Sequence, residues 1–134
     1  MTETQIPEDL RYTAEHEWVR RVGPSTVRIG VTDFAQNALN EVVFVQLPEV
    51  DSEVIEGESF AEIESHKSVS DIYGPLAGVV SAINDAVDAA PELVNSDPYG
   101  EGWLLEITVA DDADLDASLA AMLDADGYRE VIAD

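Results

Sequence analysis

The chain of 134 residues carries 29 acidic and 6 basic side chains, a formal net charge of −23. This charge argues against binding to nucleic acids or anionic membranes, which attract basic surfaces. It has no cysteine, which excludes disulfides, thiolate metal sites and a cysteine nucleophile. The acidic surface is either simply solvated or steers the chain toward basic partners, and it favours a monomer. The N-terminus lacks signal-peptide features and no apolar run is membrane-spanning, so we expect a soluble cytoplasmic protein without membrane contact.

Short runs of β-branched and alternating apolar residues recur through most of the chain and predict a sheet-rich core. The predicted strands, in chain order, span residues 16–22, 26–31, 42–47, 59–65, 68–73, 79–83 and 103–109. The valine-rich run 42–47 is expected to be buried on both faces, whereas 59–65 should alternate, with Ala61 and Ile63 on one face. Segments expected to be irregular are residues 1–14, 51–58 and 84–102.

A short helix is predicted over residues 33–39, directly after the first hairpin. Thr32 or Asp33 offers a side chain that can cap its first turn. Phe34 and Leu39 are the residues that this helix is expected to bury.

The last part of the chain changes to a helical period. An apolar face at helical spacing is formed by Leu115, Leu119, Met122 and Leu123. Asp114 is the expected cap of this C-terminal helix. Gly127 is expected to interrupt it before a second short piece that contains Tyr128.

Many short strands followed by a terminal helix predict a mainly β fold. We expect a flattened β-barrel or sandwich with a short helix after the first hairpin and a C-terminal helix. The length and the absence of a linker predict a single domain over residues 1–134. Its sheet core should span about residues 16–109 and its C-terminal helical segment about residues 114–132.

Lys67 is the only lysine of the chain and lies between two predicted strands, in the segment Ser65-His66-Lys67-Ser68. A tight turn there projects the amine into solvent, as far from the sheet as the fold allows. No acidic residue lies within two positions on either side. An ordinary exposed turn lysine has the same local features, so the flanking sequence must decide whether this amine has a function.

The flanking sequence AEIESHKSVSDIYGPLAG resembles the attachment hairpin of the biotinyl/lipoyl domain family, in which a modified lysine lies between paired strands. His66 and Ser68 stand where biotin carriers place methionines, which favours lipoate over biotin. Four blocks, one of them within this hairpin, are similar, in order, to the glycine cleavage H proteins: YTAEHEWVR, IGVTDFAQNALNEVVFVQLPEV, ESHKSVSDIYGP and ELVNSDPYGEGWLLEI. This resemblance covers nearly the whole chain, and lipoyl domains of 2-oxo acid dehydrogenases share only the hairpin.

The resemblance implies a carrier rather than an enzyme. A lipoate ligase or octanoyltransferase would lead to lipoate joined to Lys67 by an amide bond. The arm would take the aminomethyl group of glycine from the P protein (glycine decarboxylase) and deliver it to the T protein (aminomethyltransferase). The L protein (dihydrolipoyl dehydrogenase) would reoxidise the arm. The prosthetic group carries the chemistry, and the protein supplies position and protection.

The resemblance also implies a cleft that holds the loaded arm away from water. The ammonium of the aminomethyl group needs a carboxylate partner, for which Glu17 is the first candidate. Further candidates, ranked below Glu17, are Glu15, His16 and Asp71. The alternative interpretation of Glu15, Glu17 and Asp71 is an ordinary solvated acid, and that of His16 is a structural histidine of the sheet. Recognition of the attachment turn is expected to involve the neighbours of Lys67, namely Glu64, Ser65, His66 and Ser68.

Three positions depart from the pattern of that family. Asn40 and Asp51 stand where glycine is frequent, and asparagine tolerates a positive φ angle better than most residues. His66 replaces a frequent valine beside the lysine, where the modifying enzyme must recognise the turn, but the acceptor amine is retained. The only histidines, His16 and His66, lie far apart and have no cysteine companions, so no metal site is expected.

Other functions fit part of the same pattern. A lipoyl relay would hand its lipoate on to 2-oxo acid dehydrogenases, and glycine-dependent loading by the P protein distinguishes it from the leading function. An unmodified acidic binding module would keep the fold but would not need an amine at the hairpin tip, so Lys67 argues against it. A biotin carrier would need methionines beside that lysine.

Overall fold

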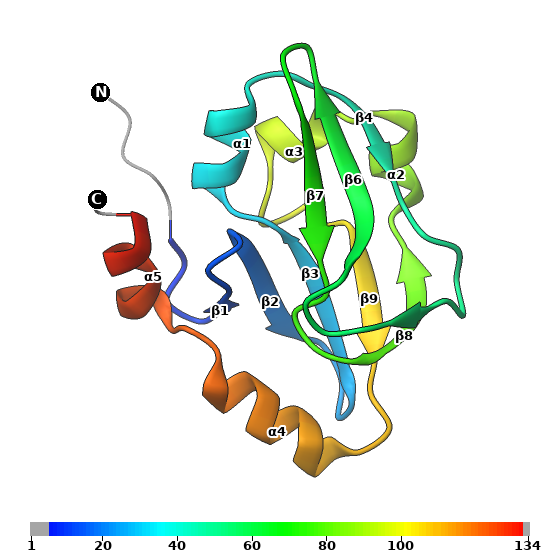
Figure 1. Ribbon diagram of the computed structural model, residues 1–134, viewed down its shortest axis with the longest axis vertical. Coiled ribbons are helices and arrows are strands. Elements are labelled where there is room, and N and C mark those ends of the chain that lie inside the picture. The colour runs from blue at the N-terminus through cyan, green and yellow to red at the C-terminus, as the bar shows by residue number, and fades with distance from the viewer. Residues whose placement is uncertain (1–5, 133–134) are drawn as a thin grey trace.

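The computed structural model describes residues 6–132, which form two antiparallel sheets and five helices (Figure 1). The larger sheet has the spatial order β1 (Arg11–Tyr12), β2 (Glu17–Arg21), β3 (Thr26–Val31), β9 (Leu105–Thr108), β8 (Gly78–Ile83) and β5 (Glu53–Val54). The smaller sheet has the order β4 (Val42–Gln46), β6 (Ser59–Ser65) and β7 (Val69–Tyr73). The helices are α1 (Asp33–Leu39), α2 (Asp85–Ala89), α3 (Leu93–Ser96), α4 (Asp112–Ala121) and α5 (Ala125–Ile132).

One continuous apolar core joins the two sheets, because alternate residues of their strands point to the same side. Ile29 and Ile107 of the larger sheet and Val45 and Ile63 of the smaller sheet belong to this core and are at most 1% exposed. Neither sheet closes on itself, so the molecule is a flattened sandwich rather than a complete barrel. The predicted fold class, with its helix after the first hairpin and its C-terminal helix, is confirmed.

A second apolar cluster joins the C-terminal helix to the start of the chain. Tyr128 of α5 stacks on Tyr12 of β1, with ring centroids 4.8 Å apart. Trp18 is fully buried in the same cluster, and its indole N–H donates to the carbonyl of Pro98 over 2.9 Å. Gly30 faces Trp18 across the β2–β3 pair, and a Cβ at that position would lie 2.7 Å from the indole ring. The large indole therefore requires glycine on the neighbouring strand.

All seven predicted strands match observed ones, namely β2, β3, β4, β6, β7, β8 and β9, to within one or two residues at each end. Two short strands, β1 and β5, lie in segments expected to be irregular, and so do α2 and α3. Those expectations were wrong because elements of two to five residues are too short to show a period. The local signal that was available is Asn84, whose side chain caps α2 by accepting the N–H of Ala86.

The expectation that residues 42–47 are buried on both faces is wrong. β4 forms an edge of the smaller sheet, and only Val42 and Val45 of this strand are buried. The register with β6 shifts between Val42 and Phe44, which turns two successive apolar residues outward. Val43 and Phe44 are consequently 42% and 45% exposed.

The helix after the first hairpin is confirmed, and Thr32 is its cap. The Thr32 side chain accepts a first-turn backbone N–H over 3.2 Å. Leu39 is buried as expected, but Phe34 is only half-buried and lies against the His16 ring, with centroids 4.8 Å apart. Gln36 occupies the second buried position of the helix instead.

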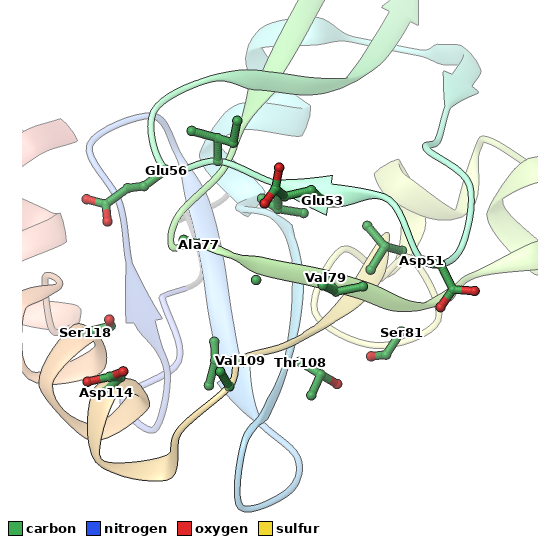
Figure 2. A pocket seen from close by; sticks show the side chains of 15 residues that line it. Asp51, Glu53, Glu56, Ala77, Val79, Ser81, Thr108, Val109, Asp114 and Ser118 are labelled. Carbon is green, nitrogen blue, oxygen red and sulfur yellow. The ribbon is translucent and has the colours of Figure 1, made fainter.

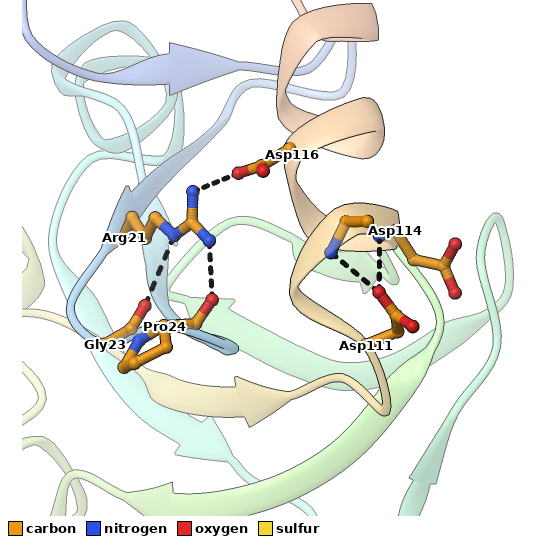
Figure 3. A network of polar contacts seen from close by, with 7 residues as sticks. Arg21, Gly23, Pro24, Asp111, Asp114 and Asp116 are labelled. Atoms are coloured by element: carbon orange, nitrogen blue, oxygen red, sulfur yellow. Dashed lines mark hydrogen bonds and ion pairs between the residues drawn. The ribbon is translucent and has the colours of Figure 1, made fainter.

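Asp111, rather than the expected Asp114, caps α4 (Figure 3). Its carboxylate accepts the backbone N–H groups of Ala113 and Asp114, over 2.7 Å and 3.4 Å. In a run of adjacent acids several side chains can cap, and the extended backbone of Asp111 selects it. Arg21 ties the same helix to the β2–β3 turn, because its guanidinium donates to Asp116 and to the turn carbonyls (Figure 3).

The break in the C-terminal helical region falls at Met122, not at Gly127. Met122 has an extended backbone, and the following residue, Leu123, pairs with Tyr12 through two backbone hydrogen bonds of 2.8 Å and 3.0 Å. Gly127 lies inside α5. Pairing with β1 therefore ends α4 and sets the start of the second helix.

Both residues that replace a frequent glycine have positive φ angles, 67° at Asn40 and 79° at Asp51. L-residues rarely adopt this region, and asparagine and aspartate do so more readily than most. The expectation that asparagine tolerates a positive φ at position 40 is confirmed. Asp51, whose side chain has nearly the same shape as that of asparagine, also adopts a positive φ angle.

Candidate functional site

Lys67 lies at the tip of the hairpin formed by β6 and β7, at one end of the molecule (Figure 1). The backbone N–H of Ser65 donates to the carbonyl of Ser68 over 2.9 Å, which closes the turn. The hydroxyl of Ser65 accepts the N–H groups of Lys67 and Ser68 over 3.4 Å and 3.3 Å. Ser65 and Ser68 therefore shape the backbone that presents the lysine.

Within residues 6–132, the Lys67 ammonium has no ion pair and its side chain is exposed. The neighbouring His66 lies 3.6 Å from a carboxylate oxygen of Glu41, and both side chains are more than 70% exposed. Glu64 lies on the outer face of the hairpin, between Phe44 and Val69 in the strand register. The tip thus offers an accessible primary amine in an acidic and partly apolar setting.

Glu17, at the first position of β2, has a buried carboxyl group that is 1% exposed. One carboxyl oxygen accepts the backbone N–H of Tyr73 over 2.7 Å, and the other accepts the Thr13 hydroxyl over 3.3 Å. Burial raises the pKa of Glu17 to about 8, and the two hydrogen bonds only partly offset this effect. Glu17 is therefore an acid that changes its charge state near neutral pH.

The Glu17 carboxyl borders a cavity of about 280 Å³, called here the Glu17 pocket. Its lining consists of Thr13, Glu15, Glu17, Glu56, Gly57, Tyr73, Gly74 and Pro75. Every ionisable side chain in this lining except Tyr73 is a carboxyl group, which suits a cationic ligand. The structure brings Glu15 and Glu17 together here, and adds Glu56, which sequence reasoning missed. Glu56 is far from Glu17 in the chain, and no local pattern marks it.

His16 and Asp71 do not line the Glu17 pocket. The His16 Nδ1 atom lies 2.8 Å from the hydroxyl of Tyr128, and burial lowers the pKa of the imidazole. The same hydroxyl lies 2.7 Å from the side-chain oxygen of Thr32. Asp71 is exposed in the middle of β7, opposite Glu62. His16 therefore joins β2 to α1 and α5, while Asp71 lies between the hairpin tip and the pocket.

The two histidines lie on different parts of the fold, one beside β2 and one in the attachment turn. In the described range 6–132, no three His, Cys, Asp or Glu side chains gather as a metal ion would require. None of the helices in that range is both long enough and apolar enough to cross a membrane.

The sequence matches the family described as glycine cleavage H-protein over residues 10–134. A glycine cleavage system H protein of Mycobacterium avium (strain 104) is 60% identical over 94% of this chain and 96% of its own length. A protein of the same name from Nocardia farcinica (strain IFM 10152) is 61% identical over the same shares. The crystal structure of a glycine cleavage system H protein from Mycobacterium marinum has a TM-score of 0.82 and 38% identity, and covers 93% of this chain and 97% of that chain.

These similarities agree in name, length and fold. The matched family contributes a lipoate-bearing carrier component to the glycine cleavage system, and it works with the enzymes of that system. The resemblance carried by the HEW segment and by the attachment hairpin is thereby confirmed. The chain belongs to the glycine cleavage H-protein family.

Proposed function

We propose that this chain carries the aminomethyl group of glycine from the P protein to the T protein on a lipoyl group that is amide-linked to Lys67. The L protein reoxidises the arm, and a lipoate ligase or octanoyltransferase supplies it. The observation that carries this proposal is the exposed hairpin tip with an amine that has no ion pair within residues 6–132. Residues 1–134 act as one cytoplasmic, monomeric carrier domain.

The residues around the tip fit such an arm. A bound lipoyl group supplies sulfur atoms that accept and release the one-carbon unit and can be oxidised and reduced. The chain presents the amine beyond the sheet, and β7 runs from the tip to the Glu17 pocket. Val69 and Tyr73 mark the ends of that strand, about 13 Å apart at roughly 3.3 Å per residue. An arm attached at the tip can therefore fold back along the strand.

The Glu17 pocket provides an electrostatic partner for the ammonium of the aminomethyl group. At pH 7 the empty pocket holds a protonated Glu17, because its pKa is raised to about 8. An ammonium beside Glu17 favours the carboxylate form, so binding lowers that pKa and releases a proton. Because Glu17 is 1% exposed, protein rather than water surrounds the carboxylate of the resulting ion pair.

The backbone around the pocket helps to exclude water from the bound group. Tyr73, Gly74 and Pro75 form one wall, and the N–H of Tyr73 already donates to Glu17. Exclusion of water slows hydrolytic loss of a labile one-carbon unit. By this proposal the chain catalyses no step, and its partner enzymes carry out the reactions.

Glycine-dependent loading tests the proposal. The lipoylated chain is incubated with purified P protein and isotopically labelled glycine, and the label on the carrier is measured by intact mass. We expect stoichiometric loading of the parent and none of a Lys67→Arg variant. A lipoylated parent that takes no label from glycine, with a P protein active on an established H protein, would contradict the proposal and favour the lipoyl relay.

A further inference from the structure

A groove of about 840 Å³ lies on the outer face of β5 and β8, between these strands and α4 (Figure 2). Its apolar floor includes Val79 and Ile55, which are 42% and 47% exposed, together with Val109. Apolar side chains of this size with such exposure leave a hydrophobic surface in water. We call this site the β5–α4 groove.

Carboxylates surround the apolar floor. Figure 2 shows Asp51 at one end of the groove, Glu53 over its middle, and Glu56 and Asp114 toward α4. No lysine, arginine or histidine is among its 15 lining residues, all of which lie within the described range. The groove therefore combines an apolar floor with a purely acidic rim.

None of the six cationic side chains of the chain lines the groove, and four of them have partners elsewhere. Arg21 pairs with Asp116, Arg28 with Glu106, and Arg129 with Glu8 and Asp126. Arg20 lies over the ring of Trp18, 5.2 Å from its centroid. The terminal segments outside the described range, MTETQ and AD, contain no basic residue. A cationic side chain beside the rim therefore has to come from another molecule.

We propose that the β5–α4 groove is a docking site for a basic, partly apolar segment of a partner enzyme of the glycine cleavage system. The segment places cationic side chains against the acidic rim and apolar side chains on Val79 and Ile55. Complementary charge favours this occupant and speeds its encounter with the carrier. A second copy of the chain does not suit the groove, because each copy has a net charge of −23 and the two copies would repel each other.

The position of the groove determines how a docked enzyme would reach the Glu17 pocket and the lipoyl arm. Glu56 lines both the β5–α4 groove and the Glu17 pocket. The tip of the β6–β7 hairpin, which carries Lys67, lies at the other end of the molecule from α4 (Figure 1). A partner seated in the groove therefore reaches the mouth of the pocket while the attachment tip stays free to move. This part of the inference rests on the proposed carrier function.

The test uses the full-length, unlipoylated chain and measures the Kd for each purified P, T and L protein. The groove variant is Glu53→Gln with Asp114→Asn, which removes two rim charges and leaves the Glu17 pocket intact. The matched control, Asp88→Asn with Glu130→Gln, removes two exposed charges outside the groove. We expect about tenfold weaker binding of the groove variant to at least one enzyme, a smaller salt dependence of that binding, and a control within about twofold of the parent.

A Val79→Thr variant tests the apolar floor with nearly unchanged side-chain shape, and the same enzyme should bind it more weakly than the parent. Equal Kd values for the groove variant and the control with all three enzymes would overturn the docking site, as would absence of parent binding to all three. Glycine-dependent loading is measured separately on the lipoylated parent. If the lipoylated parent is loaded normally but the groove variant binds the enzymes as well as the control does, only the docking proposal is overturned. If the parent is not loaded but the groove variant binds more weakly, only the aminomethyl-carrier function is overturned.

Discussion

The turn around Lys67 and the start of β2 around Glu17 are built in different ways. The turn depends on the Ser65 hydroxyl and on backbone groups of Ser65 and Ser68, and its His66–Glu41 contact is highly exposed. Glu17 is buried and hydrogen-bonded, and the neighbouring Trp18 is packed against Gly30. A mobile arm needs an accessible attachment point and a preformed receiving site, so substitutions should affect stability mainly in the second region.

The largest expected loss of stability comes from Gly30→Ala. The added Cβ would lie 2.7 Å from the Trp18 indole, so the ring or the strand must shift. Overpacking of this kind costs about 2–3 kcal/mol in the free energy of unfolding. Urea denaturation followed by circular dichroism measures the change. Gly23→Ala is the control, since its Cβ makes only ordinary contacts at 3.6 Å, and an equal loss in both variants would contradict the account.

Glu17→Gln is expected to stabilise the chain in a pH-dependent manner. The pKa of Glu17 rises from its ordinary value of 4.5 to about 8 in the folded state, so between these values only the unfolded chain has lost the proton. The free energy of unfolding of the parent therefore falls as pH rises through this window, and glutamine removes that fall. The variant should be more stable by a few kcal/mol at pH 8, up to about 4 kcal/mol from this difference in pKa, and unchanged near pH 4.

Urea denaturation across this pH range measures the difference between the variant and the parent. Glu15→Gln is the control, because Glu15 lines the same pocket but is exposed. A constant difference between Glu17→Gln and the parent at all pH values would show that Glu17 ionises normally. The stabilised variant should also hold an ammonium less well, since it lacks the carboxylate.

Tyr128→Phe tests the connection between α5 and β2. The hydroxyl lies within hydrogen-bonding distance of His16 and Thr32, at 2.8 Å and 2.7 Å, and its removal leaves buried polar atoms without that partner. We expect a loss of about 1–2 kcal/mol in the free energy of unfolding. Tyr73→Phe is the control, with an expected change below about 0.5 kcal/mol. Equal effects of the two substitutions would show that this network does not stabilise the fold.

The smallest expected effect on stability is that of His66→Val at the tip. The His66–Glu41 pair is exposed on both sides, and such pairs contribute less than about 0.5 kcal/mol. Thermal unfolding of parent and variant should therefore coincide. The rate of lipoylation of the same two proteins shows separately whether His66 affects recognition by the ligase. A large loss of stability would contradict the expectation that substitutions in the turn hardly change the free energy of unfolding.

Much of the fold follows from periodicity. The alternation of Ala61 and Ile63 correctly predicts β6, and the turn between 65 and 68 follows from the strands on either side. The exposure of Val43 and Phe44 was not predictable, because a valine-rich run does not reveal a bulge or an uncovered outer face. Similarly, the sequence does not show which of the neighbouring acidic residues caps α4.

The candidate site was predictable where the motif is local. Lys67 stands out because it is the only lysine, and Glu17 follows from the resemblance of the HEW segment. Glu56 and Tyr128 enter through tertiary contacts with distant segments, which no local pattern shows. The β5–α4 groove likewise depends on how α4 packs beside β5 and β8.

The most direct test of the central claim is the intact mass of the chain after incubation with lipoic acid, ATP and a lipoate ligase, beside the Lys67→Arg variant. This variant has no lysine, so any remaining modification must lie elsewhere. The account predicts a gain of one lipoyl group on the parent and no gain on the variant. An unmodified parent, with the ligase active on a control acceptor, or an equal gain on both proteins would contradict the assignment of Lys67 as the carrier lysine.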